Sequence, residues 1–259
     1  MDGHRADRLE KLSEYLSENG ILWTWLHVIF VVLRRLELGT FRLRGYIEHR
    51  FALPGTYYSG NNYRNWQAYD WSGLGEEWTA SHQWKESLFD EVISKHATQG
   101  SDVLEIGCGA GRWSEKLLEL SRRLVLVDIS PNTMEICKSR FSGHDNVEYH
   151  VNDGSSLGFL ADESIDFVFS FDVFTVVGSS DTARYLTECA RVLKKGGVGI
   201  IHHSGEEGSQ HGWSSVESGR FLNLLHKSGL VPITQIESWG DGYRLSDTHH
   251  GTLMTVFRR

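Results

Sequence analysis

Three closely spaced glycines after a short apolar run constrain this chain more than any other feature. Residues 103–112 read Val-Leu-Glu-Ile-Gly-Cys-Gly-Ala-Gly-Arg, and the apolar residues before Gly107 predict a buried strand. Because glycine has no side chain, Gly107, Gly109 and Gly111 allow the backbone to turn tightly against a ligand before a helix that begins near Arg112. The pattern predicts a ligand of nucleotide size at the end of this strand.

A carboxylate follows at the end of the next expected strand. Residues Leu124–Asp128 form a second apolar run that ends in Asp128. In doubly wound α/β folds, an acidic residue at this place accepts hydrogen bonds from the two hydroxyls of a ribose. The glycine turn and Asp128 together therefore predict a ligand that carries a ribose.

The spacing of the glycines separates two classes of cofactor. Dinucleotide enzymes use G-x-G-x-x-G, whose turn and following helix receive a pyrophosphate. This chain has G-x-G-x-G, and Glu105 precedes the first glycine by two residues. An acidic side chain there would repel a pyrophosphate but suits a cationic amino-acid moiety, so a hydride-transferring dehydrogenase is only a distant alternative.

The glycine segment resembles the first motif of class I S-adenosylmethionine-dependent methyltransferases, and the resemblance covers about residues 85–259. Further segments follow in the order of that family: Asp128-Ile129-Ser130 as the second motif, Asn152-Asp153-Gly154 as the third, residues 164–172 ending in Phe171-Asp172 as the fourth, and residues 191–197 as the turn before the fifth strand. Motifs in this order are far more specific than a lone glycine turn. The alternative is an α/β domain with glycine turns and no nucleotide.

The resemblance implies a set of cofactor-binding residues. In the family, the acid of the second motif holds the ribose and the next residue lies on the adenine, whose amino group donates to the aspartate of the third motif. The expected cofactor-binding residues are Glu105, Gly107, Cys108, Gly109, Gly111, Asp128, Ile129, Asp153, Gly154, Phe171 and Trp78.

The chain from Trp84 onward alternates between expected helices and strands, which predicts a mainly parallel sheet with right-handed crossovers. The expected class is α/β, a doubly wound, mostly parallel seven-stranded sheet of the Rossmann-like methyltransferase type. The resemblance implies that the last strand runs antiparallel between strands five and six. Strands are expected at 102–106, 123–128, 147–151, 165–171, 197–203, 231–238 and 251–257, and helices at 84–97, 111–121, 131–141, 180–194 and 215–228.

Residues 1–83 are expected to form a helical cap and an aromatic lid, with the methyltransferase domain at 84–259. The apolar stretch Ile21–Leu33 precedes Arg34 and Arg35. It is shorter than the roughly 20 residues that cross a bilayer, so segment 21–35 is expected to pack in the core, in a homodimer or in a membrane interface.

Residues 54–84 are expected to form a loop-rich connector that is dense in aromatic residues. In the family this part of the chain folds over cofactor and substrate as a lid, and Trp78 is the residue expected to touch the cofactor. The alternative is an aromatic plug that covers the edge of the sheet.

Composition limits the partners. Of 259 residues, 40% are hydrophobic, which supports a folded core, and the formal net charge is −8 without a long Lys/Arg run. Nucleic acid is therefore not an expected partner, because phosphate binding needs clustered positive charge. The three cysteines have no zinc or disulfide spacing, and the polar first twenty residues do not resemble a signal peptide. A cytoplasmic protein, with membrane association as an option, is expected.

Candidate catalytic residues lie where strands are expected to end. His202 and His203 close the fifth strand, Asp172 ends the fourth, and His249 and His250 open the last. A hydroxyl acceptor of a methyl group needs a base, for which histidine is suited. We therefore predict His202, His203 and Asp172 as catalytic, although neighbouring residues of a strand point to opposite faces. A His/Asp set could also hold Mg²⁺ or Mn²⁺.

The sequence thus favours an S-adenosylmethionine-dependent enzyme that methylates a hydroxyl of a sugar, saccharide or other small molecule, similar to bacterial sugar O-methyltransferases. One alternative is N-methylation of a small amine, which needs no strong base. Another is a non-catalytic cofactor-binding subunit that docks on a partner through its N-terminal apolar helix.

Overall fold

The computed structural model describes residues 3–51, 58–205, 214 and 216–259. The chain divides into two compact units, Met1–Ile47 and Glu48–Arg259. The aromatic segment that was assigned to the N-terminal part on sequence belongs to the second unit, together with the sheet. Each unit is described by itself.

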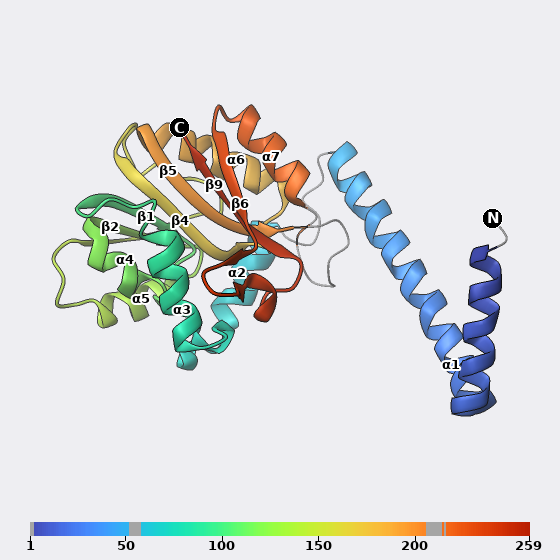
Figure 1. The fold of residues 1–259 in the computed structure, drawn as a ribbon. Coiled ribbons are helices and arrows are strands. Elements are labelled where there is room, and N and C mark those ends of the chain that lie inside the picture. Colours follow the sequence, from blue (N-terminus) through green and yellow to red (C-terminus); the bar gives the residue numbers. More distant parts are fainter. Residues whose placement is uncertain (1–2, 52–57, 206–213, 215) are drawn as a thin grey trace. The chain divides into compact units, whose positions relative to one another are not determined.

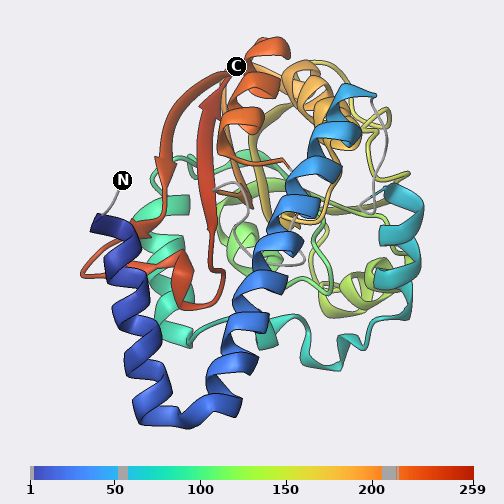
Figure 2. The ribbon, with the colours of Figure 1, turned by 90° about the vertical axis from the view of Figure 1, so that its right-hand side faces the viewer.

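The first unit is a helical hairpin. Helix α1 (Gly3–Arg50) is interrupted at Gly20, whose φ of 77° and ψ of 169° lie outside the helical range. The ribbon of α1 is correspondingly bent into two arms (Figures 1 and 2). Glycine tolerates a positive φ at little cost, which explains why the chain turns here. The Tyr15 ring on the first arm contacts Trp23 and His27 on the second, with centroids 5.7 and 5.0 Å apart.

The second unit contains a seven-stranded sheet in the order β3-β2-β1-β4-β5-β9-β6 (Figure 1). The first five of these strands run parallel, and β9 lies antiparallel between β5 and β6, as expected. The strands are β1 (Ser101–Ile106), β2 (Ser121–Asp128), β3 (Val147–Val151), β4 (Ile165–Phe174), β5 (Leu193–Ser204), β6 (Val231–Ile236) and β9 (Thr252–Arg258).

Helices cover both faces of the sheet. Side chains of α3, α4 and α5 pack on one face, where alternate strand residues such as Val103 and Phe167 point. Side chains of α6 and α7 pack on the other face, with Leu104 and Val168. The doubly wound fold is thereby confirmed. The helices are α2 (Ser59–Ala68), α3 (His82–Leu88), α4 (Ser114–Leu120), α5 (Pro131–Arg140), α6 (Ser179–Val192) and α7 (Ser218–Lys227).

Two of the differences between the structure and the expected elements are the largest. The segment expected to be a loop-rich connector contains α2 and the short helical turns Trp71–Gly73 and Glu76–Trp78. The strand expected at 231–238 ends at Ile236, and a small hairpin follows, formed by β7 (Ser238–Trp239) and β8 (Tyr243–Arg244). This hairpin carries Trp239 onto Trp84 of α3, with ring centroids 5.3 Å apart, so tertiary contact rather than local propensity ends the strand.

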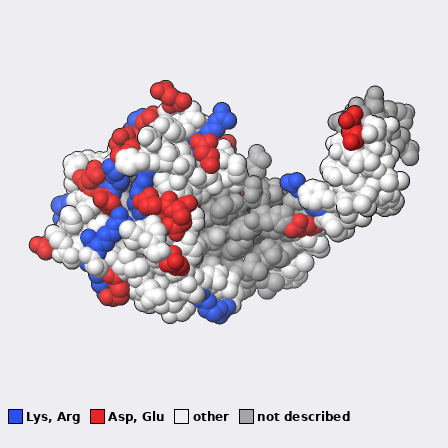
Figure 3. All heavy atoms as spheres, turned by 90° about the horizontal axis from the view of Figure 1, so that it is seen from below, with Lys and Arg blue, Asp and Glu red and all other residues white. Residues whose placement is uncertain are grey.

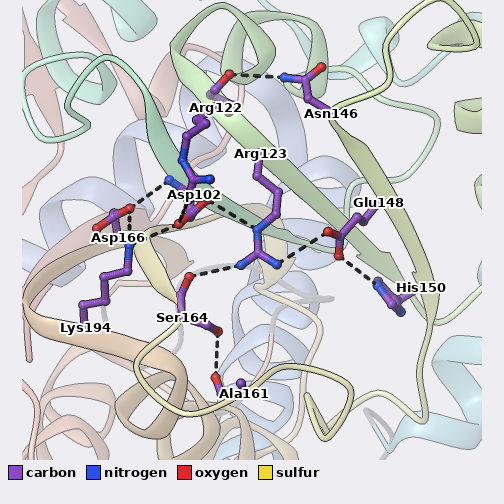
Figure 4. Close-up of polar contacts among 11 residues, drawn as sticks. Asp102, Arg122, Arg123, Asn146, Glu148, His150, Ala161, Ser164, Asp166 and Lys194 are labelled. Carbon is purple, nitrogen blue, oxygen red and sulfur yellow. Dashed lines mark hydrogen bonds and ion pairs between the residues drawn. The ribbon is translucent and has the colours of Figure 1, made fainter.

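Charged side chains of both signs are mixed over the described surface of the sheet unit that Figure 3 presents. A network of charged side chains lies where β1, β4 and β5 begin (Figure 4). The buried Asp102 carboxylate accepts hydrogen bonds from Arg122 and Lys194, and Lys194 also donates to Asp166 at 2.8 Å. Burial would raise the pKa of Asp102, but these two cations outweigh it and lower the pKa. The network joins neighbouring strands at the edge opposite the candidate site.

Candidate functional site

A cleft lies at the carboxyl ends of β1, β2 and β4, where doubly wound folds bind ligands. It holds about 830 Å³ of space free of atoms, part of it open to solvent. Ten of the predicted site residues line it: Trp78, Glu105, Gly107, Cys108, Gly109, Asp128, Ile129, Gly154, Phe171 and Asp172. Four others do not: Gly111, Asp153, His202 and His203.

The glycine turn forms the floor of the cleft. Gly107 has a φ of 71° and Gly109 has a φ of 54°. Residues other than glycine rarely adopt these backbone angles. A Cβ at Gly107 would overlap the Val173 side chain, and one at Gly109 would stand 2.9 Å from the Trp71 ring. Gly111 instead faces Phe141 beneath α5, so its role is to let the turn pack against that helix.

Asp128 is tied directly to the glycine turn. Its Oδ2 accepts from the Gly109 backbone N–H at 3.0 Å, and its Oδ1 accepts from the Ser130 N–H at 2.9 Å. The carboxylate that was expected to hold a ribose therefore lies beside the turn. Next to it, Ile129 lines the cleft together with Gly154, at which a Cβ would stand 2.9 Å from both Ile129 and Ser59.

Asp153 does not face the cleft, contrary to the expectation that it meets an adenine. Its Oδ1 accepts from the backbone N–H groups of Ser155 and Ser156 at 2.9 and 2.8 Å. Aspartate commonly closes a turn in this way, by bonding to backbone groups shortly after itself. These hydrogen bonds outweigh burial and lower the pKa of Asp153. The motif matched on sequence, but its carboxylate serves the local backbone.

Glu105 brings a buried carboxyl group to the cleft. It lies near the end of β1, and its Oε2 accepts from the Ser114 hydroxyl at 2.5 Å. Burial raises the pKa of Glu105 to about 8, although Ser114 and Arg112 oppose the shift. A cationic ligand group beside Glu105 would favour its ionised form.

The raised pKa of Glu105 predicts a pH-dependent stability. The unfolded chain loses this proton near its ordinary carboxyl pKa of 4.5, whereas the folded chain keeps it until about pH 8, so the contribution of Glu105 to stability falls as pH rises between these values. We expect the free energy of unfolding to fall by about 2 kcal/mol from pH 5 to pH 7 relative to a Glu105→Gln variant. Urea denaturation between pH 5 and pH 7 measures the free energy of unfolding of both proteins. If this free energy changes with pH equally in the two proteins, the prediction is contradicted.

A second buried charge cluster surrounds Asp172. This residue interrupts the regular register of β4 and has a φ of 63°, in the left-handed region. Its carboxylate pairs with Arg112, and Nε2 of His249 and Nδ1 of His202 lie 2.9 and 3.0 Å from Oδ1. Burial would raise the pKa of Asp172, but Arg112 and the two histidines outweigh it and hold the pKa well below its ordinary value. Asp172 is therefore an anion that faces the cleft.

Arg112 was predicted only as the start of a helix, yet it is a principal residue of the cleft. Its guanidinium is buried and lies 5.8, 5.7 and 5.4 Å from the ring centroids of Trp78, Trp113 and Phe171. Among the described residues its Nη1 has no hydrogen-bond partner. No sequence signal distinguishes this arginine from a solvated one, because its burial depends on Trp78 and Phe171, which come from two other segments.

His203 is not placed for catalysis, so its predicted catalytic role is wrong. Its Nδ1 lies 2.7 Å from the Ser204 carbonyl oxygen and its Nε2 lies 2.7 Å from the Thr255 hydroxyl. The ring stacks on Phe221, on the face of the sheet covered by α7. Burial lowers the pKa of His203 to about 3, so it stays neutral.

His202 reaches the cleft only through another residue. It is fully buried and stacks on Phe171, and its Nδ1 lies 3.2 Å from the Asp172 backbone nitrogen and 3.0 Å from the Asp172 carboxylate. His249, which the sequence placed at the same sheet edge, contacts the same carboxylate, whereas His250 is exposed. The group that can act on a ligand is therefore Asp172, supported by His202 and His249. In the described part of the chain, no cluster of three or more His, Cys, Asp or Glu residues could hold a metal ion.

Aromatic residues of the segment 59–78 line one side of the cleft. Trp66, Trp71 and Trp78 contact one another with ring centroids about 6 Å apart, and all three line the cleft. Polar contacts attach this segment to the sheet unit: Asn62 donates to the Val176 carbonyl, and the Ser59 N–H donates to Asp181. The segment forms one wall of the cleft.

Comparison with known proteins agrees with this fold. Residues 104–201 match the model of a family described as a methyltransferase domain. A probable S-adenosylmethionine-dependent methyltransferase of Mycolicibacterium smegmatis is 31% identical over 131 residues, which covers 50% of this chain and 47% of that protein. A malonyl-[acyl-carrier protein] O-methyltransferase of Serratia marcescens is 28% identical over 169 residues, covering 61% of this chain and 62% of that protein. Each alignment thus spans less than two thirds of the relative.

A solved structure shares the fold over more of the chain. The N-methyltransferase NodS of Bradyrhizobium japonicum, in complex with S-adenosyl-L-homocysteine, superposes with a TM-score of 0.57 at 19% identity. The superposition covers 78% of this chain and 98% of NodS. At this identity the likeness concerns the fold alone.

Proposed function

We infer that this chain, whose residues 104–201 belong to the methyltransferase domain family, is a class I S-adenosylmethionine-dependent methyltransferase that acts on a small molecule. The observation that carries this inference is the contact between the Gly109 N–H and the Asp128 carboxylate on the floor of an open cleft. It brings the two most specific parts of the sequence pattern together at the edge of the sheet where such ligands bind.

The residues of the cleft fit S-adenosylmethionine chemically. Gly107 and Gly109 line the cleft, and because neither carries a Cβ the backbone of this turn is exposed to a ligand in the cleft. Asp128 offers carboxylate oxygens to ribose hydroxyls, and Glu105 offers a buried carboxyl group to a cationic amino-acid moiety. When bound, S-adenosylmethionine supplies an electrophilic methyl group.

We propose that the acceptor is a hydroxyl of a sugar, saccharide or similar small molecule. The tryptophans of the lid suit a flat, partly apolar face of such a molecule. Asp172 stays ionised and faces the cleft, so it would accept a hydrogen bond from the reacting hydroxyl and orient it. S-adenosylmethionine bound in the cleft would supply the methyl group, and its sulfur would keep the electrons of the broken carbon–sulfur bond. Asp172 would accept the hydroxyl proton, and His249 would hold the Asp172 carboxylate in place.

Replacing His249 with phenylalanine tests this assignment. We expect turnover of a hydroxylated acceptor to fall by about 100-fold, since Asp172 loses the imidazole that positions its carboxylate, while cofactor affinity changes little. Release of S-adenosylhomocysteine, measured with a panel of monosaccharides in the presence of Mg²⁺ and of a chelator, gives the rate. The matched control is His250→Phe, because His250 is the exposed neighbour in the same loop. Equal losses in both variants would contradict the role of His249.

N-methylation of a small amine is the second candidate. It is favoured by the ionised Asp172, because a carboxylate in the cleft would also accept a hydrogen bond from a neutral amine and orient it. A neutral amine needs no strong base, so His249→Phe would then leave turnover of amine acceptors close to that of the unmodified protein. The same assay with a panel of small amines distinguishes the two acceptor classes.

A further inference from the structure

The second arm of the helical hairpin carries large apolar side chains that the hairpin itself does not cover. Within the first unit the contacts of this arm involve its opposite side, where Thr24 is buried and His27 lies against Tyr15. The uncovered side chains are between 56% and 73% exposed: Ile21, Leu22, Trp25, Leu26, Phe30 and Leu33. We call this surface the apolar arm.

The apolar arm is too wide for a single helix partner. At about 100° per residue, its side chains span roughly 180° of the helix circumference. A helix that packs against one neighbour buries a stripe of about 100°. A second copy of the chain that contributes one helix would therefore leave much of this surface in water, whereas lipid can cover all of it.

Length determines how the arm can meet lipid. The segment Tyr15–Glu37 has a mean hydropathy of 1.4 and enough residues to cross a membrane. Gly20 breaks it, however, and Arg34 and Arg35 follow Leu33. The uncharged helix between them is about 20 Å long, shorter than the roughly 30 Å of a bilayer's hydrocarbon core. The arm is therefore suited to insert into one leaflet of a bilayer and not to cross it.

The charge beside the apolar arm favours anionic lipid. Residues 34–50 contain five arginines and two glutamates, although the whole chain has a net charge of −8. Arg34 and Arg35 are exposed at the end of the arm, where they would meet phosphate groups, while Trp23 and Trp25 lie at its other end. Most of the described surface of the first unit that Figure 3 presents is uncharged.

We propose that the apolar arm, residues 21–35, inserts into the interface of a membrane that contains anionic lipid and so anchors the protein there. Flotation of the full chain with vesicles tests this directly. We expect binding to vesicles of phosphatidylcholine mixed with phosphatidylglycerol, and weaker binding to phosphatidylcholine alone. Added salt should weaken binding to the vesicles that contain phosphatidylglycerol and leave binding to phosphatidylcholine alone unchanged, because salt screens only the contribution of the arginines.

Two variants separate the apolar and the electrostatic contributions. Leu26→Glu combined with Phe30→Glu should abolish flotation on both kinds of vesicle, and Arg34→Gln combined with Arg35→Gln should lower affinity for the anionic vesicles by about 30-fold. Val231→Glu is the matched control, because it places a glutamate on an exposed apolar position of β6. It should leave flotation unchanged.

Other partners that could cover the apolar arm would give different results in these experiments. If a second copy covers it, light scattering shows a dimer that Leu26→Glu with Phe30→Glu converts to a monomer, and no flotation occurs. If the chain's own second unit covers it, the protein is a monomer that does not float, and the same variant is thermally destabilised. Either result overturns the proposal, and neither depends on methyltransferase activity.

Discussion

Replacement of Asp172 by alanine is expected to lower the free energy of unfolding by about 3–5 kcal/mol and to abolish turnover. The carboxylate neutralises the buried Arg112 and contacts His202 and His249, so its removal leaves a buried guanidinium without a counter-charge. Denaturant unfolding of the purified variant measures the loss. A change below about 1 kcal/mol would show that water reaches Arg112 and that the pair contributes little.

Two companion variants identify the cause of this loss. Asp172 has a positive φ, which alanine tolerates poorly and asparagine tolerates better, so Asp172→Asn isolates the loss of charge from backbone strain. Combining Asp172→Asn with Arg112→Met removes both charges. Because replacing a whole buried pair costs much less than breaking it, the double variant should recover most of the lost stability.

Replacement of Asp128 by alanine is expected to weaken binding of S-adenosylmethionine by about 100- to 10,000-fold. The carboxylate would hold two ribose hydroxyls, and each hydrogen bond to a charged group contributes about 1.5–3 kcal/mol. It also fixes the Gly109 N–H, so the floor of the cleft loosens as well. Isothermal titration with S-adenosylmethionine measures the change in affinity.

Asp153→Ala is the matched control for this measurement. Both aspartates belong to motifs of the family, but only Asp128 lines the cleft, whereas Asp153 closes a turn beside it. The control variant should keep its affinity within a few-fold of the unmodified protein. A loss as large as that of Asp128→Ala would mean that the turn at Asp153 opens toward the cofactor on binding.

The fold was largely predictable because apolar periodicity reports burial. The seven strands of the sheet lie where the apolar runs predicted them, and β9 runs antiparallel between β5 and β6. Residues 54–84 were expected to be loop-rich because Asn and Gly are frequent there and Pro54-Gly55 marks a turn. The short helix and turns of this segment are held instead by contacts with distant residues, such as that of Asn62 with the Val176 carbonyl.

The candidate site was predictable only in part. Gly107, Gly109 and Asp128 were identified because backbone approach and carboxylate chemistry leave a local pattern. Arg112 and His249 acquire their places from Asp172, 60 and 77 residues away in the chain. Such pairing has no signature in the neighbouring sequence.

Two adjacent residues that the sequence predicted equally as catalytic are distinguished only by the folded sheet. His202 and His203 differ by one position, yet the pleat of β5 turns the first toward Asp172 and the second toward Phe221. The sequence by itself determined the strands, the glycine turn and the acid beside it, because these depend on local backbone conformation and on apolar periodicity. The tertiary structure alone decided which charges are buried together, because burial and counter-charge arise only when distant segments pack.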